Sequence, residues 1–436
     1  MKGIMITAPS SGSGKTTITM GIIRAIKNMG NNVCAFKTGP DYIDTAFLSK
    51  AAGRIAGNLD MHLQGENGMK MALYLGEGDM CVIEGVMGYF DGMHNTFINS
   101  SYDISKKIGA NAVLVYTMKG EMFSAVPKIK GMVDFNGSMI KGVILNRVKK
   151  AHFDMIKGPI EEYTGVKVIG YVPLMEDVEL ESRHLGLVQS LEIEDIEERL
   201  EKLSKTIMDT VDINMLIELM SELDVKPMVE FKKRNIKVGI AYDKAFSFYY
   251  RENIYMLEKT CKVKYFSPIN DKKTPECDLI YLGGGYPEVF SEELSKNTEM
   301  RNSIREFAQN GGCIFGECGG FMYLTNCIDG IPMAGVFNGE STMTKSLQRF
   351  GYLDMELNED CLLGKKGERL TAHEFHKSKT VIDDSALYKI QNAMGSKEWE
   401  CGYGYKNTLA GYPHINFIGN IRAFNRMLDY IEERTC

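Results

Sequence analysis

The sequence predicts an α/β fold in two domains. Short apolar runs alternate with helical patterns in both halves of the 436-residue chain, which is typical of parallel sheets covered by helices. A loop rich in glycine and serine follows the first apolar run, and a cysteine between glycines follows an apolar run of the second half. The chain is long enough for two domains that each have their own core.

The first half has six predicted strands and four predicted helices. The strands are Gly3–Thr7, Asn32–Lys37, Met80–Glu84, Ala112–Thr117, Lys141–Asn146 and Val166–Val172, and the helices begin at Lys15, Tyr102, Met122 and Phe153. We expect residues 1–190 to form one domain. Residues 191–234 have no strand pattern, and their acidic run Glu192–Glu198 is typical of a solvated helix face. We expect them to be a helical connection.

A second α/β pattern occupies residues 235–436. Its predicted strands are Ile236–Ala241, Lys262–Phe266, Leu279–Leu282, Cys313–Phe315 and Phe350–Glu356, and a predicted helix at Ile421–Glu433 follows them. No internal repeat interrupts either half.

Composition narrows the class of protein. Hydrophobic residues make up 44% and charged residues 25%, as in ordinary globular proteins. The net charge of -6 argues against a nucleic-acid binder. Ten cysteines lie without a C-x-x-C pair or zinc spacing, which indicates reduced thiols. No leader pattern and no apolar run of ~20 residues is present, so we expect a cytoplasmic protein without membrane contact. We expect it to be a monomer or a homodimer.

The first loop resembles a phosphate-binding P-loop, in which backbone amides surround phosphates and a lysine reaches them. Pro9 occupies the position of the first glycine of that motif, while Gly14, Lys15 and Thr16 fit it. The proline indicates the variant loop of dethiobiotin synthetase-like proteins, and Ser10 stands where the membrane-partitioning relatives have a second lysine. The expected ATP-binding residues are Gly12, Ser13, Gly14, Lys15, Thr16 and Thr17.

Acidic residues follow the next strands of the same sheet. Asp41, Glu84 and Asp91 should converge near the phosphates, because ligands bind beyond the carboxyl ends of parallel strands. Carboxylates at a triphosphate site usually imply Mg²⁺, and we expect Thr16, Asp41 and Glu84 to bind it. The alternative is that such residues, Asp44 among them, only cap turns or helices. Asn146 ends another strand and is a candidate to read adenine.

The second motif is a nucleophile elbow with Cys318 at its tip, suited to attack on a carboxamide. The thiol needs a base, and His414 is the best-placed histidine. Backbone donors for an oxyanion are expected from Gly284, Gly285 and Gly319.

Two other histidines, His373 and His376, lie in the later part of the chain. His373 and His376 are expected to belong to a separate structural or substrate element, and Cys313 to the core. Class I glutamine amidotransferases have a glutamate two residues after the base, where this chain has Asn416. A dyad can still work, because the third member mainly orients the imidazole; an inactive glutaminase is the alternative.

Taken together, these motifs resemble the cobyrinic acid a,c-diamide synthase family over nearly the whole chain. The resemblance is carried by the P-loop and by the segments Gly39–Asp44, Glu84–Gly88, Ser182–Leu187, Ala241–Tyr250, Gly283–Glu288, Gly316–Gly320 and His373–His376. It implies an N-terminal P-loop amidoligase domain, similar to dethiobiotin synthetase, and a C-terminal class I glutamine amidotransferase-like domain.

The resemblance also implies a ligase reaction in cobalamin biosynthesis. L-Glutamine would be hydrolysed at Cys318, and ATP with Mg²⁺ would activate the c and a acetate carboxylates of cobyrinic acid as acyl phosphates that ammonia converts to amides. Candidates to bind this acidic tetrapyrrole are Tyr42, Asp91, Arg183 and His184; Arg183 and His184 could instead only cap the N-terminal domain.

Other substrates and one other class of protein stay open. Thr45, Ala372 and Asn416 depart from the family pattern. Because of Thr45 and Ala372, the sequence does not fix which tetrapyrrole is the substrate. Hydrogenobyrinic acid and nickel-sirohydrochlorin are the alternatives to cobyrinic acid. Cobyric acid synthase shares the domain plan, but it is usually longer and its motifs differ. A nucleotide switch of the MinD/ParA type is the alternative from another class, and Ser10 argues against it.

Overall fold

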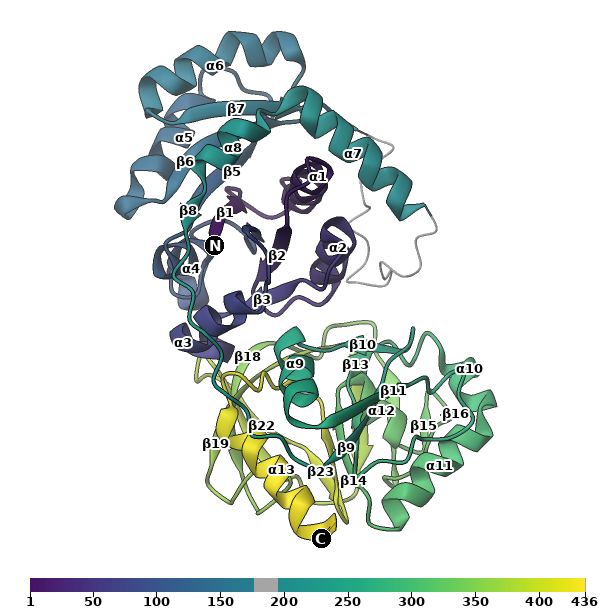
Figure 1. The fold of residues 1–436 in the computed structure, drawn as a ribbon. Coiled ribbons are helices and arrows are strands. Elements are labelled where there is room, and N and C mark those ends of the chain that lie inside the picture. The colour runs from purple at the N-terminus through teal and green to yellow at the C-terminus, as the bar shows by residue number, and fades with distance from the viewer. Residues whose placement is uncertain (176–194, 436) are drawn as a thin grey trace. The chain divides into compact units, whose positions relative to one another are not determined.

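A computed structural model describes residues 1–175 and 195–435 and divides the chain into two compact units. The first comprises residues 1–61 and 65–228, and the second comprises residues 62–64 and 229–436. Within the described ranges, no helix is both long and apolar enough to cross a bilayer. The α/β fold predicted from the sequence is confirmed in both units (Figure 1).

The first unit is built on a parallel sheet with the strand order β3-β2-β4-β1-β5-β6-β7. Its strands are β1 (Lys2–Thr7), β2 (Val33–Thr38), β3 (Gly57–Leu59), β4 (Met80–Glu84), β5 (Asn111–Thr117), β6 (Ile140–Asn146) and β7 (Lys167–Val172). The central strands are almost entirely buried, which explains their continuous apolar runs. A short β8 (Ser221–Glu222) pairs antiparallel with β1.

Helices connect these strands. They are α1 (Lys15–Asn28), α2 (Ile43–Ala52), α3 (Met61–Tyr74), α4 (Ser101–Ile108), α5 (Ala125–Asp134) and α6 (Lys150–Thr164), with α7 (Ile196–Thr210) and α8 (Ile213–Leu219) later in the chain. The helix predicted at Met122 begins at Ala125, and the one predicted at Phe153 begins at Lys150.

Helices α7 and α8 lie in the stretch that we expected to link the domains. Their apolar residues Leu200, Leu203, Ile207 and Leu216 join the core formed by α1, α2 and the inner face of the sheet. Figure 1 shows α7 beside α1. The amphipathic pattern of this stretch therefore buries its apolar face within the first unit.

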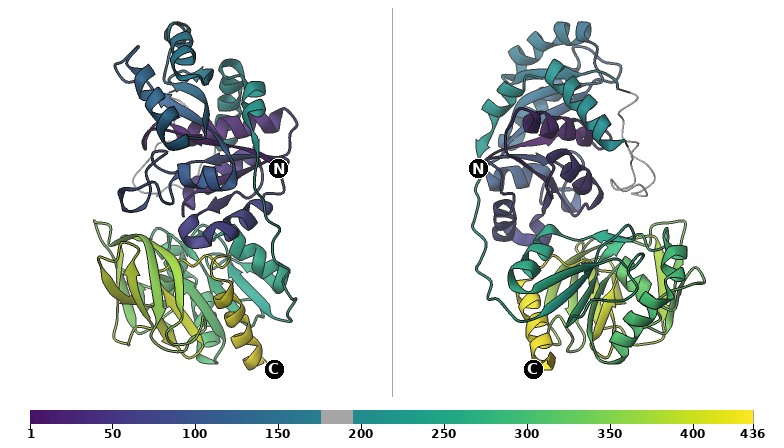
Figure 2. Two further views of the ribbon diagram at one scale, coloured as in Figure 1. Left: turned by 90° about the vertical axis from the view of Figure 1, so that its left-hand side faces the viewer. Right: turned by 45° about the vertical axis from the view of Figure 1, so that its right-hand side comes forward.

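The second unit contains a sheet with the order β11-β9-β12-β14-β24-β23, parallel except at β23. Its strands are β9 (Lys237–Ala241), β11 (Lys262–Phe266), β12 (Leu279–Leu282), β14 (Cys313–Glu317), β23 (Tyr403–Tyr405) and β24 (Thr408–Gly411). Helices α9 (Arg251–Thr260), α10 (Ser291–Lys296), α11 (Thr298–Gln309) and α12 (Gly319–Leu324) lie between them in sequence. Helix α13 (Ile421–Thr435), yellow in Figure 2, is the last element.

Smaller sheets complete this unit. The pair β10 (Phe246–Phe248) and β13 (Gly284–Gly285) is antiparallel. One four-stranded sheet contains β15 (Cys327–Ile328), β16 (Ile331–Pro332), β17 (Gly339–Met343) and β20 (Ser378–Ile382). The other contains β18 (Arg349–Leu357), β19 (Arg369–His376), β21 (Tyr388–Asn392) and β22 (Glu398–Cys401). The sequence analysis predicted only β18 of these, because the others lack apolar runs.

Candidate active site

The P-loop connects β1 to α1, at the centre of the first sheet. Gly14 has φ 81°, and a Cβ there would lie 2.5 Å from Asn146 Nδ2, so the position requires glycine. Lys15 Nζ donates to the backbone oxygens of Ser10 (3.1 Å) and Met87 (2.7 Å). Burial, followed by the nearby Lys37, lowers the pKa of Lys15 to about 8.

A buried cluster of charges lies at the ends of β2 and β4. Glu84 is fully buried, and its Oε1 accepts hydrogen bonds from Thr16 Oγ1 (2.5 Å) and Lys37 Nζ (2.9 Å). Lys37 Nζ also contacts Asp44 Oδ2 at 2.7 Å. Burial raises the pKa of Glu84 to about 7. Burial alone would lower the pKa of Lys37, but the two carboxylates raise it above its ordinary value.

This cluster fits a bound cation. Glu84 Oε2 is buried and has no hydrogen-bond partner within the described residues, while the P-loop hydroxyl of Thr16 lies against the other oxygen of the same carboxylate. A hydroxyl and a carboxylate are oxygen donors of the kind that Mg²⁺ prefers. In the described ranges, no group of three or more His, Cys, Asp or Glu side chains is arranged to hold a metal ion.

Asp41 and Asp91 have structural contacts as well. Asp41 Oδ1 accepts the backbone N–H groups of Ile43 and Asp44, each at 2.9 Å, at the start of α2. Burial, followed by Asp44, raises the pKa of Asp41 to about 6. Asp91 Oδ2 accepts the backbone N–H of Gly88 at 2.9 Å and fixes the loop after β4. Their predicted roles toward metal and substrate stay predictions.

Asn146 ends β6 and contacts the P-loop. Its Nδ2 donates to the Ser13 backbone oxygen at 2.9 Å, and its Oδ1 accepts the Arg147 N–H at 2.9 Å. This side chain therefore stabilises the P-loop. The predicted contact of Asn146 with adenine stays a prediction. Arg183 and His184 lie outside the described residues. Tyr42 immediately precedes α2.

Sequence reasoning missed Lys37. It lies at the end of a strand whose six residues are all buried, and its own exposed fraction is 3%. A lysine inside such a strand requires a buried partner. That signal was present in the run Val33–Thr38.

In the second unit, Cys318 forms the turn between β14 and α12. It has φ 47° and ψ -103°, the strained backbone expected of a nucleophile elbow. The following glycines permit close packing: a Cβ at Gly320 would lie 2.2 Å from the Leu282 oxygen, and one at Gly319 would lie 3.0 Å from the Gly285 nitrogen. Burial, followed by the carboxylates of Glu288 and Glu374, raises the pKa of the Cys318 thiol above its ordinary value.

His414 follows β24 and reaches the same place. A Cβ at Gly284 would lie 2.4 Å from His414 Cε1, so the imidazole rests on the predicted oxyanion loop. The Cys318 N–H donates to the Gly411 oxygen at 2.8 Å, which ties the elbow to the end of β24. Burial lowers the pKa of His414 to about 3, which keeps the imidazole neutral, as a general base must be. The structure thus gathers the predicted nucleophile, base and oxyanion glycines.

The segment His373–His376 is not separate from this site, and that expectation was wrong. His373 and His414 exchange backbone hydrogen bonds of 3.1 and 2.8 Å. The His376 ring stacks on Tyr412 with centroids 3.6 Å apart. Glu374 lies between His373 and His376 in sequence and is 1% exposed. Its Oε2 lies 3.7 Å from His376 Nε2. The backbone pairing of His373 with His414 places this segment beside the proposed base. The order of residues in the sequence does not reveal this pairing.

The loop after His414 is held by three side chains that sequence reasoning missed. Glu317 Oε1 accepts the Ile415 N–H at 2.8 Å, and Asn253 contacts the same loop on its other side. Asn416 Nδ2 lies 3.4 Å from Glu252 Oε2. The signals were a glutamate at the end of an otherwise apolar strand and two polar residues, Glu252 and Asn253, which follow a family-like motif after one intervening residue.

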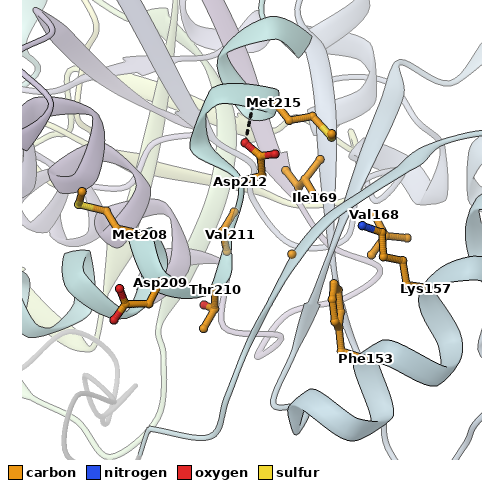
Figure 3. Close-up of a pocket in the computed structure, with 11 residues that line it drawn as sticks. Phe153, Lys157, Val168, Ile169, Met208, Asp209, Thr210, Val211, Asp212 and Met215 are labelled. Carbon is orange, nitrogen blue, oxygen red and sulfur yellow. Dashed lines mark hydrogen bonds between the residues drawn. The ribbon is translucent and has the colours of Figure 1, made fainter.

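A cavity elsewhere in the first unit contains none of the predicted site residues. It measures about 310 Å³ and is lined by residues of α6, β7, α7 and α8, among them Phe153, Lys157, Ile169 and Met215 (Figure 3). The carboxylate of Asp212 there accepts the Met215 N–H at 2.9 Å and caps α8.

Comparison with known proteins finds two domains in this chain. A CobQ/CobB/MinD/ParA nucleotide binding domain matches residues 4–188, and a CobB/CobQ-like glutamine amidotransferase domain matches residues 237–420. The chain is similar to proteins named cobyrinate a,c-diamide synthase. That of Clostridium tetani is 42% identical over 98% of this chain and 100% of its own length.

Two further relatives carry the same name. The protein of Clostridium acetobutylicum is 42% identical over 97% of this chain and 98% of its own length. That of Fusobacterium nucleatum is 41% identical over 97% of this chain and 99% of its own length. Since similarity of this degree spans both domains, the chain belongs to the cobyrinate a,c-diamide synthase family.

Proposed function

We propose that this protein converts the a and c acetate carboxylates of cobyrinic acid to amides, using ATP and L-glutamine. The observation that supports the proposal is the presence of two candidate reaction centres in one chain. Lys15, Thr16 and Glu84 gather at a P-loop, while Cys318 and His414 gather at a nucleophile elbow. The relatives' shared name supplies the substrate.

The glutaminase centre supplies nitrogen. Cys318 attacks the carboxamide of glutamine, and His414 accepts the thiol proton and passes it to the departing ammonia. The acyl group remains on sulfur as a thioester until water releases glutamate. The backbone amides of Gly285 and Gly319 are proposed to stabilise the oxyanion, with Gly284 beside the imidazole.

The P-loop centre makes the carboxylate reactive. A free carboxylate is a poor electrophile, whereas transfer of the terminal phosphoryl group of ATP to it gives an acyl phosphate with a good leaving group. Ammonia then forms the amide as phosphate departs. Lys15 stabilises charge on the transferred group, and Lys37 offsets the buried carboxylates of Glu84 and Asp44.

Mg²⁺, when bound, would neutralise phosphate charge, and we propose that Thr16 and Glu84 hold it, with Asp41 as a further ligand. The unpartnered Glu84 Oε2 supports this assignment. Tyr42, Asp91, Arg183 and His184 remain the proposed contacts to the tetrapyrrole, and Asn146 the proposed contact to adenine.

The decisive experiment incubates purified protein with ATP, Mg²⁺ and glutamine, and with cobyrinic acid, hydrogenobyrinic acid or nickel-sirohydrochlorin in turn. Mass spectrometry counts the amides added. We expect two amides on cobyrinic acid, and faster turnover than on the other rings. Preferred amidation of another ring would show that this ring is the substrate, while the proposed reaction would stay the same. Nucleotide-dependent dimerisation without glutamine turnover would support the nucleotide-switch alternative instead.

A further inference from the structure

The glutaminase centre lacks the glutamate that usually follows the base by two residues. Asn416 stands there, and its side chain is engaged away from the imidazole: Nδ2 lies 3.4 Å from Glu252 Oε2, and Oδ1 accepts the Ile418 N–H at 3.1 Å. The side-chain hydrogen bonds of Asn416 therefore go to Glu252 and Ile418.

Glu317 is the residue directly before the nucleophile, and it contacts the residue directly after the base. Its Oε1 accepts the Ile415 N–H at 2.8 Å, and its Oε2 accepts the hydroxyl hydrogen of Tyr281 at 2.7 Å. Glu317 is 2% exposed and Tyr281 is 1% exposed, so water does not compete for these bonds.

Asn253 also binds the loop that follows His414. Asn253 Nδ2 donates to the Ile415 oxygen at 2.7 Å, and Asn253 Oδ1 accepts the Phe417 N–H at 2.7 Å. The backbone N–H and oxygen of His414 pair with His373. Of these contacts to residues 414–417, the one from Glu317 comes from the segment that carries Cys318, which the Cys318 N–H also ties to the Gly411 oxygen.

We propose that Glu317 is a positioning residue of the glutaminase centre, which sets the separation of Cys318 and His414 through the Ile415 N–H. It does this through the backbone of the loop that follows His414. The inference rests on the proposed function, since it takes Cys318 and His414 as nucleophile and base.

The test replaces Glu317 with methionine, which has a similar length but no acceptor, and with glutamine, which can still accept the Ile415 N–H. We expect Glu317→Met to lower glutamine-dependent kcat by about 100-fold, since a misplacement near 1 Å costs that much. The KM for glutamine should change by less than about threefold. Glu317→Gln should restore kcat to within a few-fold, because it keeps the positioning bond.

Two further readouts separate positioning from general stability. The rate at which 6-diazo-5-oxo-L-norleucine alkylates Cys318 should fall in Glu317→Met in parallel with kcat, while ammonia-dependent synthesis stays as in the parent. Tyr281→Phe is the matched control, because it removes the other hydrogen bond of Glu317. It should retain glutamine-dependent kcat within about threefold, since the Ile415 bond remains.

Equal losses in Glu317→Met and Tyr281→Phe, or an unchanged kcat in Glu317→Met, would overturn the inference. If Glu317→Met does not fold, Asn253→Ala, which frees the other side of Ile415, must show the same selective loss with glutamine. Failure of the proposed function looks different, because Cys318→Ala would then itself retain glutamine-dependent synthesis.

Discussion

Lys37 is a buried cation between two carboxylates, with its Nζ 2.7 Å from Asp44 Oδ2 and 2.9 Å from Glu84 Oε1. Removing one member of a buried ionic group leaves the others uncompensated. Lys37→Met should lower the free energy of unfolding by about 3–5 kcal/mol, measured by urea denaturation. It should also abolish synthesis with either nitrogen source.

The control for this variant is Lys167→Met, at an exposed position of β7. It should change the free energy of unfolding by less than about 0.5 kcal/mol. A Lys37→Met protein as stable as the parent would show that Glu84 and Asp44 do not require the cation.

Glu317 makes a pH-dependent contribution to stability. Burial raises its pKa from 4.5 to about 7. Because the native pKa lies above the unfolded one, the folded protein holds this proton more tightly. The contribution is therefore complete below pH 4.5 and is lost as pH rises through about 7.

Glu317→Gln removes that titration. Between pH 5 and pH 8, the parent should lose up to about 3 kcal/mol more of its free energy of unfolding than the variant does. Urea denaturation at both pH values measures the difference. Identical pH dependence in the two proteins would show that Glu317 does not titrate in this range.

At the scale of elements, α7 packs directly on α1. A Cβ at Gly21 of α1 would lie 2.7 Å from Ile207 Cγ1 and 2.8 Å from Leu203 Cγ. Gly21→Ala should therefore destabilise the protein by about 1–3 kcal/mol, although alanine favours helices. Gly131→Ala is the control, because its Cβ would meet nothing within 4 Å, and it should stabilise the exposed α5 slightly. Equal thermal denaturation midpoints for both variants would contradict the packing of α7.

The oxyanion loop and the base are similarly close. Gly284→Ala would place Cβ 2.4 Å from His414 Cε1 and displace the imidazole. We expect glutamine-dependent kcat to fall by about 100-fold, while ammonia-dependent synthesis continues. Steady-state kinetics with each nitrogen source checks this, and undiminished use of glutamine would mean that His414 is not the base.

At the scale of the whole molecule, substitutions in the glutaminase centre and in the P-loop centre should have different effects on synthesis with glutamine and with ammonia. Cys318→Ser should lose glutamine-dependent synthesis and keep synthesis with high ammonium at alkaline pH, where more free NH₃ is present. Lys15→Ala should lose both, because no nitrogen source replaces activation of the carboxylate. Product formation with each nitrogen source is the measurement. Ammonia-dependent synthesis near the parent rate in Lys15→Ala would exclude the P-loop as the activating centre.

The sequence by itself determined the central strands and the local motifs. Strands β4 and β12 begin and end at the predicted residues, because strands buried on both faces appear as continuous apolar runs. The P-loop was recognisable because Gly12 and Gly14 adopt positive φ, which favours glycine. The Cys318 elbow was recognisable from the spacing of Gly316, Cys318 and Gly320.

Only the tertiary structure decided which polar groups meet. Glu317 contacts a residue 98 positions away, and Asn253 contacts one 162 positions away. Lys37 pairs with Glu84 because β2 and β4 are neighbours in the sheet although β3 lies between them in the chain. Strands β19 to β22, with half-polar faces, carried little local signal. Periodicity reports burial along one segment, whereas the partners of a buried charge depend on how distant segments pack.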